Sequence, residues 1–331
     1  MNRIRMISSK EKYNIKITEN QAKLKLIAQA KVNLNLDILG KRADGYHELH
    51  SVMQSLALHD IILLIAKKNE KPQTKINLTS DKVIIKDIKE NIAYRSAQAF
   101  LDHFALQADL EIYLNKKIPL AAGLAGGSAN AAAVLRGLGD LFNDQRTRTF
   151  FKGKRQEPIS KMELLSLAST IGADVSFSLH RGTALCEGIG EKISPLRSFT
   201  PKPVLIFSPQ FTTLTKEAFQ WLNAPPLTES AFQNLRTATM YNQMFDQGLK
   251  EMNAQLKNDF TPALINKFPE LNDVFAAFSE TGAPFVRLTG SGPTIYAIYD
   301  SYVARDSALA ELNKLNLLGT FISTYTQDAW D

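Results

Sequence analysis

Apolar and polar residues alternate along much of residues 24–67, a pattern typical of half-buried β-strands. The strands that this alternation predicts lie at residues 24–28, 32–39, 51–58 and 61–67, and a further strand is expected at 75–78. The turn-forming residues 40–46 separate the second strand from the third. The third and fourth strands are expected to be joined by a short break at His59-Asp60. The chain therefore starts with a set of neighbouring strands.

The spacing of apolar residues becomes helical at Asn91 and stays so to about residue 104, with Asn91 as the expected N-cap. Further helices are predicted at 128–142 and at 160–171, where Ser160 caps and Glu163 stands at the capping-box position. Other strands are expected at residues 110–114, 183–186, 192–196 and 204–207, with a strand–turn–strand region around 285–299. Helices and strands mix without a regular βαβ rhythm, so the pattern favours the α+β class.

The length of 331 residues and a hydrophobic content of 44% favour two domains, each with its own core. The proline-containing segment between Pro195 and Pro203 is the best candidate for the boundary. The expected parts are a basic amino-terminal arm at 1–22, a domain at 23–198 with a basic insertion near 143–158, and a domain at 199–331.

The net charge of +6 is concentrated in two segments. Residues 1–30 hold seven basic and two acidic side chains, and residues 143–161 hold six basic and two acidic ones. Both segments are interpreted as solvated surface. A nucleic-acid binder would more often show a basic face with interleaved aromatic residues and a recognisable module, so no nucleic-acid partner is expected.

Two absences in the sequence bear on where the protein acts. No run approaches the roughly 18 apolar residues that a membrane span needs, so no membrane partner is expected. The single cysteine, Cys186, rules out a disulfide framework within the chain and fits a reducing compartment. A cytoplasmic location is therefore expected.

A glycine-rich loop lies between the predicted strand at 110–114 and the helix at 128–142, with the sequence Pro-Leu-Ala-Ala-Gly-Leu-Ala-Gly-Gly-Ser-Ala-Asn from Pro119 to Asn130. Small residues let the main chain approach phosphate, and the following helix offers unpaired N–H groups. The loop lacks the Gly-Lys-Ser/Thr ending of a Walker A loop and does not match Gly-x-Gly-x-x-Gly. Phosphate binding and tight strand–helix packing are both open interpretations.

Three other features have candidate chemistry. Asp174 stands among small and apolar residues, where a carboxylate is poorly solvated and can act as a base toward a hydroxyl or simply cap a helix or turn after Gly172. Lys31 interrupts an apolar strand, and its ammonium either reaches the surface or faces an anion. The segment Thr-Gly-Ser-Gly-Pro at 289–293 is a second glycine turn with hydroxyl groups.

Taken together and in order, the segments at 28–34, 40–47, 119–128, 172–175 and 289–293 resemble the GHMP kinases. That superfamily includes galactokinase, homoserine kinase, mevalonate kinase and phosphomevalonate kinase. The resemblance extends from about residue 25 to residue 299. It implies a two-domain fold, with an amino-terminal domain like domain 2 of ribosomal protein S5, a ferredoxin-like carboxy-terminal domain, and the active site in the cleft between them.

One branch of the superfamily is especially similar through the segment Gly40-Lys41-Arg42-Ala43-Asp44-Gly45-Tyr46-His47. This branch acts on a cytidine diphosphate ester of methylerythritol in the non-mevalonate route to isoprenoid precursors. Four other segments, at 91–95, 187–191, 258–260 (Asn258-Asp259-Phe260) and 288–296, are similar to the same branch. The resemblance implies ATP-dependent phosphorylation of the 2-hydroxyl of the methylerythritol moiety, by a cytoplasmic monomer or homodimer.

The resemblance also implies roles for individual residues. Asp174 would take the proton from the hydroxyl, and Lys31 would stabilise the developing charge. Mg²⁺ is implied as a counter-charge for the phosphates, with Ser128 as a candidate contact. The residues expected to bind ATP are Asn91, Lys116, Pro119, Leu120, Ala121, Ala122, Gly123, Leu124, Ala125, Gly126, Gly127, Ser128 and Ala129.

The substrate residues implied by the same resemblance surround a cytosine and a diphosphate. Tyr46 would stack on the base and His47 would hydrogen-bond to its edge, while Phe219 would supply the opposing aromatic ring. Thr215, at the start of the segment that contains Phe219, is also an expected substrate residue. Asn33 would lie near the diphosphate.

The sequence departs from the family pattern at two positions, where Gln29 and Ser176 replace the usual prolines. Two alternatives stay open on the sequence. One is another GHMP kinase that acts on a small molecule such as mevalonate or homoserine. The other is a catalytically inactive binding protein of the same fold, although such a protein has no need for a base beside a cation.

Overall fold

The computed structural model describes residues 15–68, 73–82, 87–198 and 201–328, and packing divides them into two compact units. The first unit contains the described parts of residues 1–28, 60–116 and 130–171, and the second contains 29–59, 117–129 and those from 172 onward. Residues 1–14 of the expected basic arm lie outside the described residues. The limits of the two domains expected from the sequence stay a prediction.

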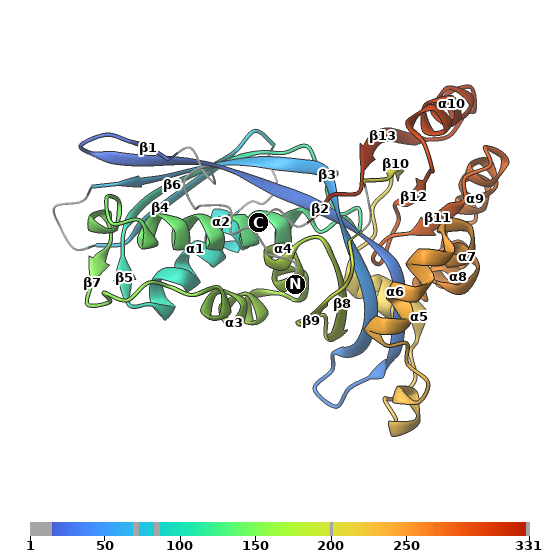
Figure 1. Ribbon diagram of the computed structural model, residues 1–331, viewed down its shortest axis with the longest axis horizontal. Coiled ribbons are helices and arrows are strands. Elements are labelled where there is room, and N and C mark those ends of the chain that lie inside the picture. The colour runs from blue at the N-terminus through green and yellow to red at the C-terminus, as the bar shows by residue number, and fades with distance from the viewer. Residues whose placement is uncertain (1–14, 69–72, 83–86, 199–200, 329–331) are drawn as a thin grey trace, which may run out of the picture. The chain divides into compact units, whose positions relative to one another are not determined.

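Two long strands, β2 (Gln21–Lys41) and β3 (His47–Lys67), pass through both units (Figure 1). The sequence predicted two separate strands in each of these ranges, and the predicted break at His59-Asp60 is wrong. Asp60 is fully buried, and its carboxylate accepts hydrogen bonds from Lys116 Nζ and, at 2.9 Å, from Asn130 Nδ2. Because these partners satisfy the acid inside the protein, the strand continues through a residue that usually favours a turn.

In the first unit, the strands form a mixed sheet. β1 (Lys16–Ile17) pairs antiparallel with β2, and β6 (Asp109–Asn115) pairs antiparallel with β3 and parallel with β4 (Lys75–Ser80). The short strands β5 (Leu106–Gln107) and β7 (Lys152–Gly153) form a separate pair.

The helices of the first unit lie on one face of this sheet (Figure 1). They are α1 (Ile92–His103), the part of α2 (Gly126–Asn143) from Asn130 onward and α3 (Lys161–Ile171). The unit also contains two short 3₁₀ helices, η1 (Ile88–Glu90) and η2 (Arg148–Phe150). A Cβ placed on Gly137 of α2 would lie 2.5 Å from the side chain of Leu26 and 3.0 Å from that of Leu64. The missing side chain therefore lets α2 approach β2 and β3 closely.

The predicted helix caps are confirmed. The Asn91 side chain accepts a hydrogen bond of 2.9 Å from the N–H of Ala93 at the start of α1. At α3, the Ser160 N–H donates to the Glu163 carboxylate (2.8 Å) and the Glu163 N–H donates to Ser160 Oγ (3.2 Å), which is a complete capping box. These bonds from Ser160, together with Arg155, lower the pKa of Glu163 to about 2.

The basic insertion is more tightly packed than the sequence predicted. Phe150 and Phe151 are buried, Arg148 donates to the carbonyls of Phe142 and Gln156, and Arg155 forms an ion pair of 2.8 Å with Glu163. The interpretation of this segment as simply solvated surface is therefore wrong for these residues. Phe150 and Phe151 hold this charged segment against the protein, because each aromatic side chain buries a large apolar area.

In the second unit, β3 pairs antiparallel with β8 (Thr183–Gly188), which pairs with β9 (Lys192–Pro195). The helix α4 (Ala173–His180) precedes β8. The second unit also contains a four-stranded antiparallel sheet in the order β11 (Phe285–Leu288), β12 (Ile295–Ile298), β10 (Pro203–Pro209) and β13 (Gly319–Tyr325). This order, with helices in the two crossovers, is that of a ferredoxin-like sheet.

Both faces of the four-stranded sheet are covered because successive residues of β10 point to opposite sides. Val204 and Ile206 belong to one apolar cluster, and Leu205 and Phe207 to another. The helices of this unit are α5 (Thr215–Leu222), η3 (Glu229–Phe232), α6 (Ala238–Gln247), α7 (Leu249–Gln255), α8 (Phe260–Lys267), α9 (Leu271–Glu280) and α10 (Tyr302–Leu312). Residues of α6 and α7 join the first cluster, and residues of α8, α9 and α10 join the second.

None of the helices in the described part of the chain has both the length and the apolar character that a membrane crossing requires.

Candidate functional site

One face of strand β2 in the second unit carries a row of buried polar side chains. Lys31, Asn33, Asn35 and Asp37 alternate with apolar residues, so the two-residue period of a strand places all four on the same face. Each is at most 9% exposed. Buried polar groups need partners, and the partners of this row define the candidate site.

Lys31 faces Asp174, which the sequence placed 143 residues away. Lys31 Nζ lies 3.8 Å from Asp174 Oδ2, and the lysine side chain is 4% exposed whereas that of the aspartate is 32% exposed. Asp174 lies in the first turn of α4, where a carboxylate also interacts favourably with the helix dipole. A carboxylate that is open to solvent on one side and faces a buried cation on the other can take a proton from a hydroxyl.

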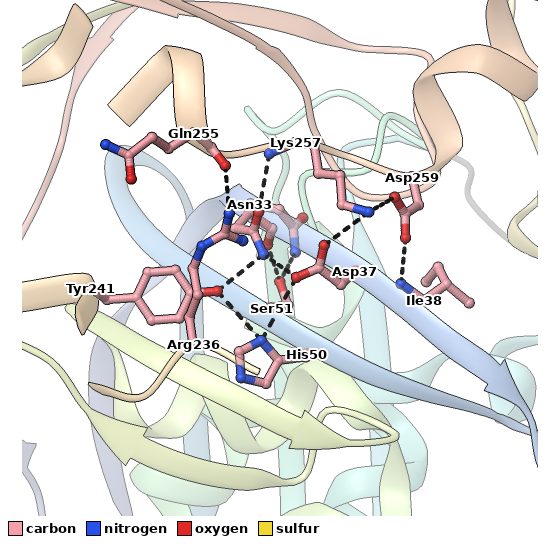
Figure 2. Close-up of polar contacts among 11 residues, drawn as sticks. Asn33, Asp37, Ile38, His50, Ser51, Arg236, Tyr241, Gln255, Lys257 and Asp259 are labelled. Carbon is pink, nitrogen blue, oxygen red and sulfur yellow. Dashed lines mark hydrogen bonds and ion pairs between the residues drawn. The ribbon is translucent and has the colours of Figure 1, made fainter. Parts of the chain in front are cut away.

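Asn33 holds the Lys31 ammonium in place. Its Oδ1 accepts hydrogen bonds from Lys31 Nζ (2.7 Å) and from the backbone N–H of Gly290 (2.8 Å). Its Nδ2 donates to Ser51 Oγ (2.8 Å), which in turn donates to the carbonyl of Asn35 (2.7 Å; Figure 2). A flipped amide would turn its NH₂ group toward two other donors, so the contacts fix one orientation.

The turn at 289–292 packs directly against the glycine-rich loop. Gly123 has φ +70°, and a Cβ there would lie 2.2 Å from the carbonyl oxygen of Thr289. Thr289 Oγ1 donates to the Gly123 carbonyl (3.2 Å), and the N–H of Lys31 donates to the carbonyl of Leu124 (3.2 Å). Glycine is required at this position both by backbone conformation and by the lack of space.

The loop leads into α2 with its backbone donors available. The helix begins at Gly126, after Ala125 with φ +55°, and its first hydrogen bond to the loop runs from the Ala129 N–H to the Ala125 carbonyl (2.9 Å). The N–H groups of the residues before Ala129 therefore have no partner within the helix. With two glycines in the first turn, such a helix end suits an anion.

The loop residues expected to contact phosphate differ in exposure. Ala122, Leu124 and Ala129 are buried, while the others in the segment are half-buried or exposed, and these are Pro119, Leu120, Ala121, Gly123, Ala125, Gly126, Gly127 and Ser128. Leu120 is an exposed large apolar side chain. The buried side chains of Ala122, Leu124 and Ala129 therefore anchor the loop, while the remaining residues are accessible to a ligand.

Asn91 and Lys116, the other expected ATP residues, belong to the first unit. Asn91 is buried and caps α1 with its side-chain oxygen. Lys116 is also buried, and its ammonium donates to Asp60 and, at 2.7 Å, to Asn130 Oδ1. Both side chains have structural partners in this state, and their roles toward ATP stay a prediction.

The expected substrate residues gather in part. The ring of His47 stacks on that of Phe219, with centroids 4.3 Å apart and an interplanar angle of 16°. Phe219 lies on α5, and Thr215 at the start of that helix has its hydroxyl 3.1 Å from Ser291 Oγ. Tyr46 is 61% exposed, and its backbone N–H donates to Asp44 Oδ1 (3.0 Å). One aromatic face is thus covered by His47, while the tyrosine ring projects into solvent.

The state of His47 follows from its surroundings. Burial lowers the pKa of its ring below the ordinary value of 6.5, and the positive charge of Lys41 lowers it further. The ring is therefore neutral near pH 7, with one nitrogen to donate and one to accept a hydrogen bond. A neutral ring of this kind can read the edge of a base.

Two parts of the site were not assigned a role from the sequence. Ser51 orients the Asn33 amide from strand β3, and Gly290 N–H holds the same side chain. The turn at 289–293 was predicted as a glycine turn and contributed to the family resemblance, but Gly290 itself was given no role, and no local signal distinguishes Ser51 from other strand serines. Both residues contact Asn33 only because segments that are distant in the sequence pack together in the folded chain.

No group of three or more His, Cys, Asp or Glu side chains is positioned to hold a metal ion within the part of the chain that the structure describes. Mg²⁺ is commonly bound by one or two protein groups together with the phosphates of its ligand. The Ser128 hydroxyl at the start of α2 and the partly exposed Asp174 are groups of the kind that such a shared site uses.

Comparison with protein families matches two segments of the chain. Residues 91–182 match the GHMP kinases N terminal domain, and residues 240–316 match the GHMP kinases C terminal domain. The matched segments include helix α2 and Asp174 in the first case and the turn at 289–292 in the second.

Curated relatives are similar over most of the chain. A protein of Clostridium botulinum (strain Loch Maree / Type A3) named 4-diphosphocytidyl-2-C-methyl-D-erythritol kinase is 36% identical over 273 residues, covering 82% of this chain and 90% of that protein. A protein of Clostridium beijerinckii with the same name is 32% identical and covers 88% of this chain and 96% of its own length.

Solved structures agree. A crystal structure of 4-(cytidine 5'-diphospho)-2C-methyl-D-erythritol kinase is similar with a TM-score of 0.70 and 25% identity, covering 92% of this chain and all of that one. A homoserine kinase from Cytophaga hutchinsonii has a TM-score of 0.65 at 19% identity, which indicates a shared fold.

Proposed function

Because this chain belongs to the 4-diphosphocytidyl-2-C-methyl-D-erythritol kinase family of GHMP kinases, we propose that it transfers the γ-phosphoryl group of ATP to the 2-hydroxyl of 4-diphosphocytidyl-2-C-methyl-D-erythritol. The product would feed the non-mevalonate route to isoprenoid precursors. The observation that carries the proposal is the buried Lys31 ammonium held 3.8 Å from Asp174 beside a glycine-rich loop.

In the proposed reaction, the substrate hydroxyl loses its proton to Asp174 as its oxygen attacks the γ-phosphorus. The bond between that phosphorus and the bridging oxygen breaks, and ADP leaves. Lys31 stabilises the charge that develops near the attacking oxygen, and Asn33 keeps the ammonium oriented. Catalysis of this kind depends mainly on position and on charge stabilisation, so a few fixed groups are enough.

The glycine-rich loop would hold the ATP phosphates with the free N–H groups at the start of α2. Asn91 and Lys116 are proposed to contact the adenine region, which requires their present partners to be shared or exchanged. We propose Mg²⁺ as the ion bound with these phosphates, where it would neutralise charge on the β- and γ-phosphates. Ser128 is the proposed protein contact.

The cytidine end is proposed to bind at Tyr46, His47 and Phe219. Support comes from the neutral His47 ring, the exposed Tyr46 and the aromatic face that α5 supplies. Because the His47 ring already stacks on Phe219, the cytosine base would have to stack on the part of the Phe219 ring that His47 leaves open, or displace His47 from it. Thr215 and Asn33 are proposed to lie toward the diphosphate.

The proposed setting is the cytoplasm, in agreement with the free and buried thiol of Cys186. A monomer or homodimer with no nucleic-acid partner remains our expectation.

The test is ATP consumption by the purified chain with three acceptors at equal concentration: 4-diphosphocytidyl-2-C-methyl-D-erythritol, mevalonate and homoserine. We expect efficient turnover only with the first. Equal or better turnover of mevalonate or homoserine would replace the proposed substrate and keep the kinase. ATP binding without turnover of any of the three would point to a binding protein of this fold.

A further inference from the structure

The segment Lys257-Asn258-Asp259 is fixed along strand β2 by its backbone. The Leu36 N–H donates to the carbonyl of Lys257 (2.9 Å), and the Asp259 N–H donates to the carbonyl of Leu36 (3.0 Å). The Ile38 N–H donates to the carboxylate of Asp259 (2.8 Å), as Figure 2 shows. The segment therefore behaves as a short extra partner of β2.

Side chains strengthen this attachment. Lys257 Nζ lies 2.7 Å from Asp259 Oδ1 and 3.3 Å from Asp37 Oδ1, and the Lys257 N–H donates to Asn35 Oδ1 (3.0 Å). Burial raises the pKa of Asp37, but hydrogen bonds from His50 and Asn35 and the charge of Lys257 outweigh it, so its net pKa lies below the usual value. Asp37 is accordingly an anion at neutral pH and pairs with the Lys257 ammonium of this segment.

Asn258, in the middle of this segment, reaches away from β2 to the turn at 289–292. Its Nδ2 donates to the carbonyls of Leu288 (2.9 Å) and Gly290 (3.0 Å), and its Oδ1 accepts from the N–H of Phe260 (3.0 Å). The residue is 3% exposed. The amide thus donates both to the last residue of β11 and to Gly290 in the turn itself, which is more than a local cap requires.

Gly290 links this contact to the reactive pair. Its carbonyl is held by Asn258, and its N–H donates to Asn33 Oδ1, the oxygen that also accepts from Lys31. A Cβ on Gly290 would lie 3.0 Å from the Gly123 carbonyl oxygen and 3.4 Å from Lys31 Nζ. The turn thus fits closely between the loop and the lysine, and a shift of the turn would move Asn33 and Lys31 with it.

We propose that Asn258 is a positioning residue for the phosphoryl transfer: by tethering the turn at 289–292 to strand β2, it sets the Gly290 N–H against Asn33 and so aligns Lys31 with Asp174. The inference rests on the proposed function, because it takes Lys31 and Asp174 as the reacting pair. It gives the Asn258-Asp259-Phe260 motif a role that is distinct from substrate contact.

The test uses Asn258→Ser and Asn258→Asp in the full chain. A serine or aspartate oxygen can still accept the Phe260 N–H across the local turn, but neither side chain can donate to both carbonyls. The matched control is Asn253→Ala, since Asn253 also tethers strand β11, but through the N–H of Val286 (3.1 Å) and the Arg287 guanidinium (3.0 Å), two residues that precede the turn.

We expect both Asn258 variants to lose about 10- to 100-fold in kcat per binding site, because small misplacements of reacting groups have effects of that size. Sites are counted by calorimetric titration with a non-hydrolysable ATP analogue, so that loss of folded protein is not read as loss of rate. KM for ATP should change less than threefold, and Asn253→Ala should keep kcat within about twofold. A kcat per site within twofold of the parent in both Asn258 variants, or an equal loss in Asn253→Ala, would overturn the proposal.

A double-mutant cycle separates positioning from general weakening. If Asn258 acts through Asn33, then Asn258→Ser adds little to the rate loss of Asn33→Ala, whereas independent effects would multiply. Multiplying effects would contradict the proposal. The same assays on Asp174→Asn distinguish a failure of the proposed function from a failure of the positioning role. Full turnover of Asp174→Asn would refute Asp174 as the base. Loss of turnover in Asp174→Asn together with normal turnover in Asn258→Ser would refute only the positioning role of Asn258.

Discussion

The Lys31 ammonium and the Asp174 carboxylate lie 3.8 Å apart, with the first side chain 4% exposed and the second 32% exposed. The cation is fixed in the interior by Asn33, while the acid keeps one side open to an incoming group. This asymmetry is what a base beside a charge stabiliser requires, and it leads to the first prediction.

Asp174→Asn should bind ATP and the cytidine substrate but lose about 10²- to 10⁴-fold in kcat, because the amide cannot take the proton. Steady-state kinetics with binding measured separately check this. Asp246→Asn is the control, because the Asp246 side chain is 67% exposed and pairs at 2.6 Å with Arg197, an arginine that is itself largely exposed. Turnover of Asp174→Asn close to that of Asp246→Asn would remove Asp174 from the mechanism.

Tyr46→Ala should raise KM for the cytidine substrate by about 3- to 10-fold, the loss expected for one aromatic stack of about 1 kcal/mol. The ring is 61% exposed, so the free energy of unfolding should change by less than about 0.5 kcal/mol. KM for ATP should be unchanged, and Tyr46→Phe should behave like the parent. An unaltered KM for the cytidine substrate in the alanine variant would contradict the proposed base pocket.

The lowered pKa of His47 predicts a pH dependence of stability with a definite sign. Burial and Lys41 lower the pKa in the folded protein, so the unfolded chain binds its proton first as the pH falls. His47 therefore costs no stability above its ordinary pKa of 6.5 and makes the folded state less stable as the pH falls below that value.

Denaturant unfolding of the parent and of His47→Gln, at pH 8 and pH 5.5, measures this effect. The parent should lose more stability between the two values than the variant does. In the same range, KM for the cytidine substrate should be flat down to about pH 6.5 and should rise below it as the ring protonates. Parallel losses of stability in both proteins would show that His47 contributes nothing to the pH dependence.

Gly123→Ala should disrupt the site beyond the usual backbone strain. An alanine at positive φ costs about 1–2 kcal/mol, and here its Cβ would also meet the Thr289 carbonyl at 2.2 Å. The control is Gly282→Ala, because Gly282 has a similar φ of +73° and, among the residues that the structure describes, the added Cβ would meet no atom within 4 Å.

We expect Gly282→Ala to lower the melting temperature by a few degrees and to keep kcat. Gly123→Ala should be less stable than Gly282→Ala and should lose at least about 10-fold in kcat, since the displaced turn carries Gly290 away from Asn33. Equal stability and equal kcat in the two variants would mean that the loop and the turn do not pack as described.

Much of the local structure could be predicted from the sequence because its causes lie within a few residues. The Asn91 cap and the Ser160–Glu163 capping box are formed by neighbours two or three positions apart. The motifs around Tyr46, Asp174 and Thr289 indicated the family, which the comparisons confirm. The burial of Phe150 and Phe151 in the insertion at 143–161 could not be predicted from the sequence, because the residues against which they pack are brought together only in the folded unit.

The sequence by itself determined that residues 32–39 alternate as a strand, so that Asn33, Asn35 and Asp37 share one face, since a period of two requires nothing beyond the strand itself. Only the tertiary structure decided what that face meets. Asn33 is held by Gly290, 257 positions away, and His47 lies on Phe219 from a distant helix. β3 also continues through Asp60, because Lys116 and Asn130 satisfy that buried acid. Such contacts arise from the packing of whole elements, and no local pattern of residues specifies the partner.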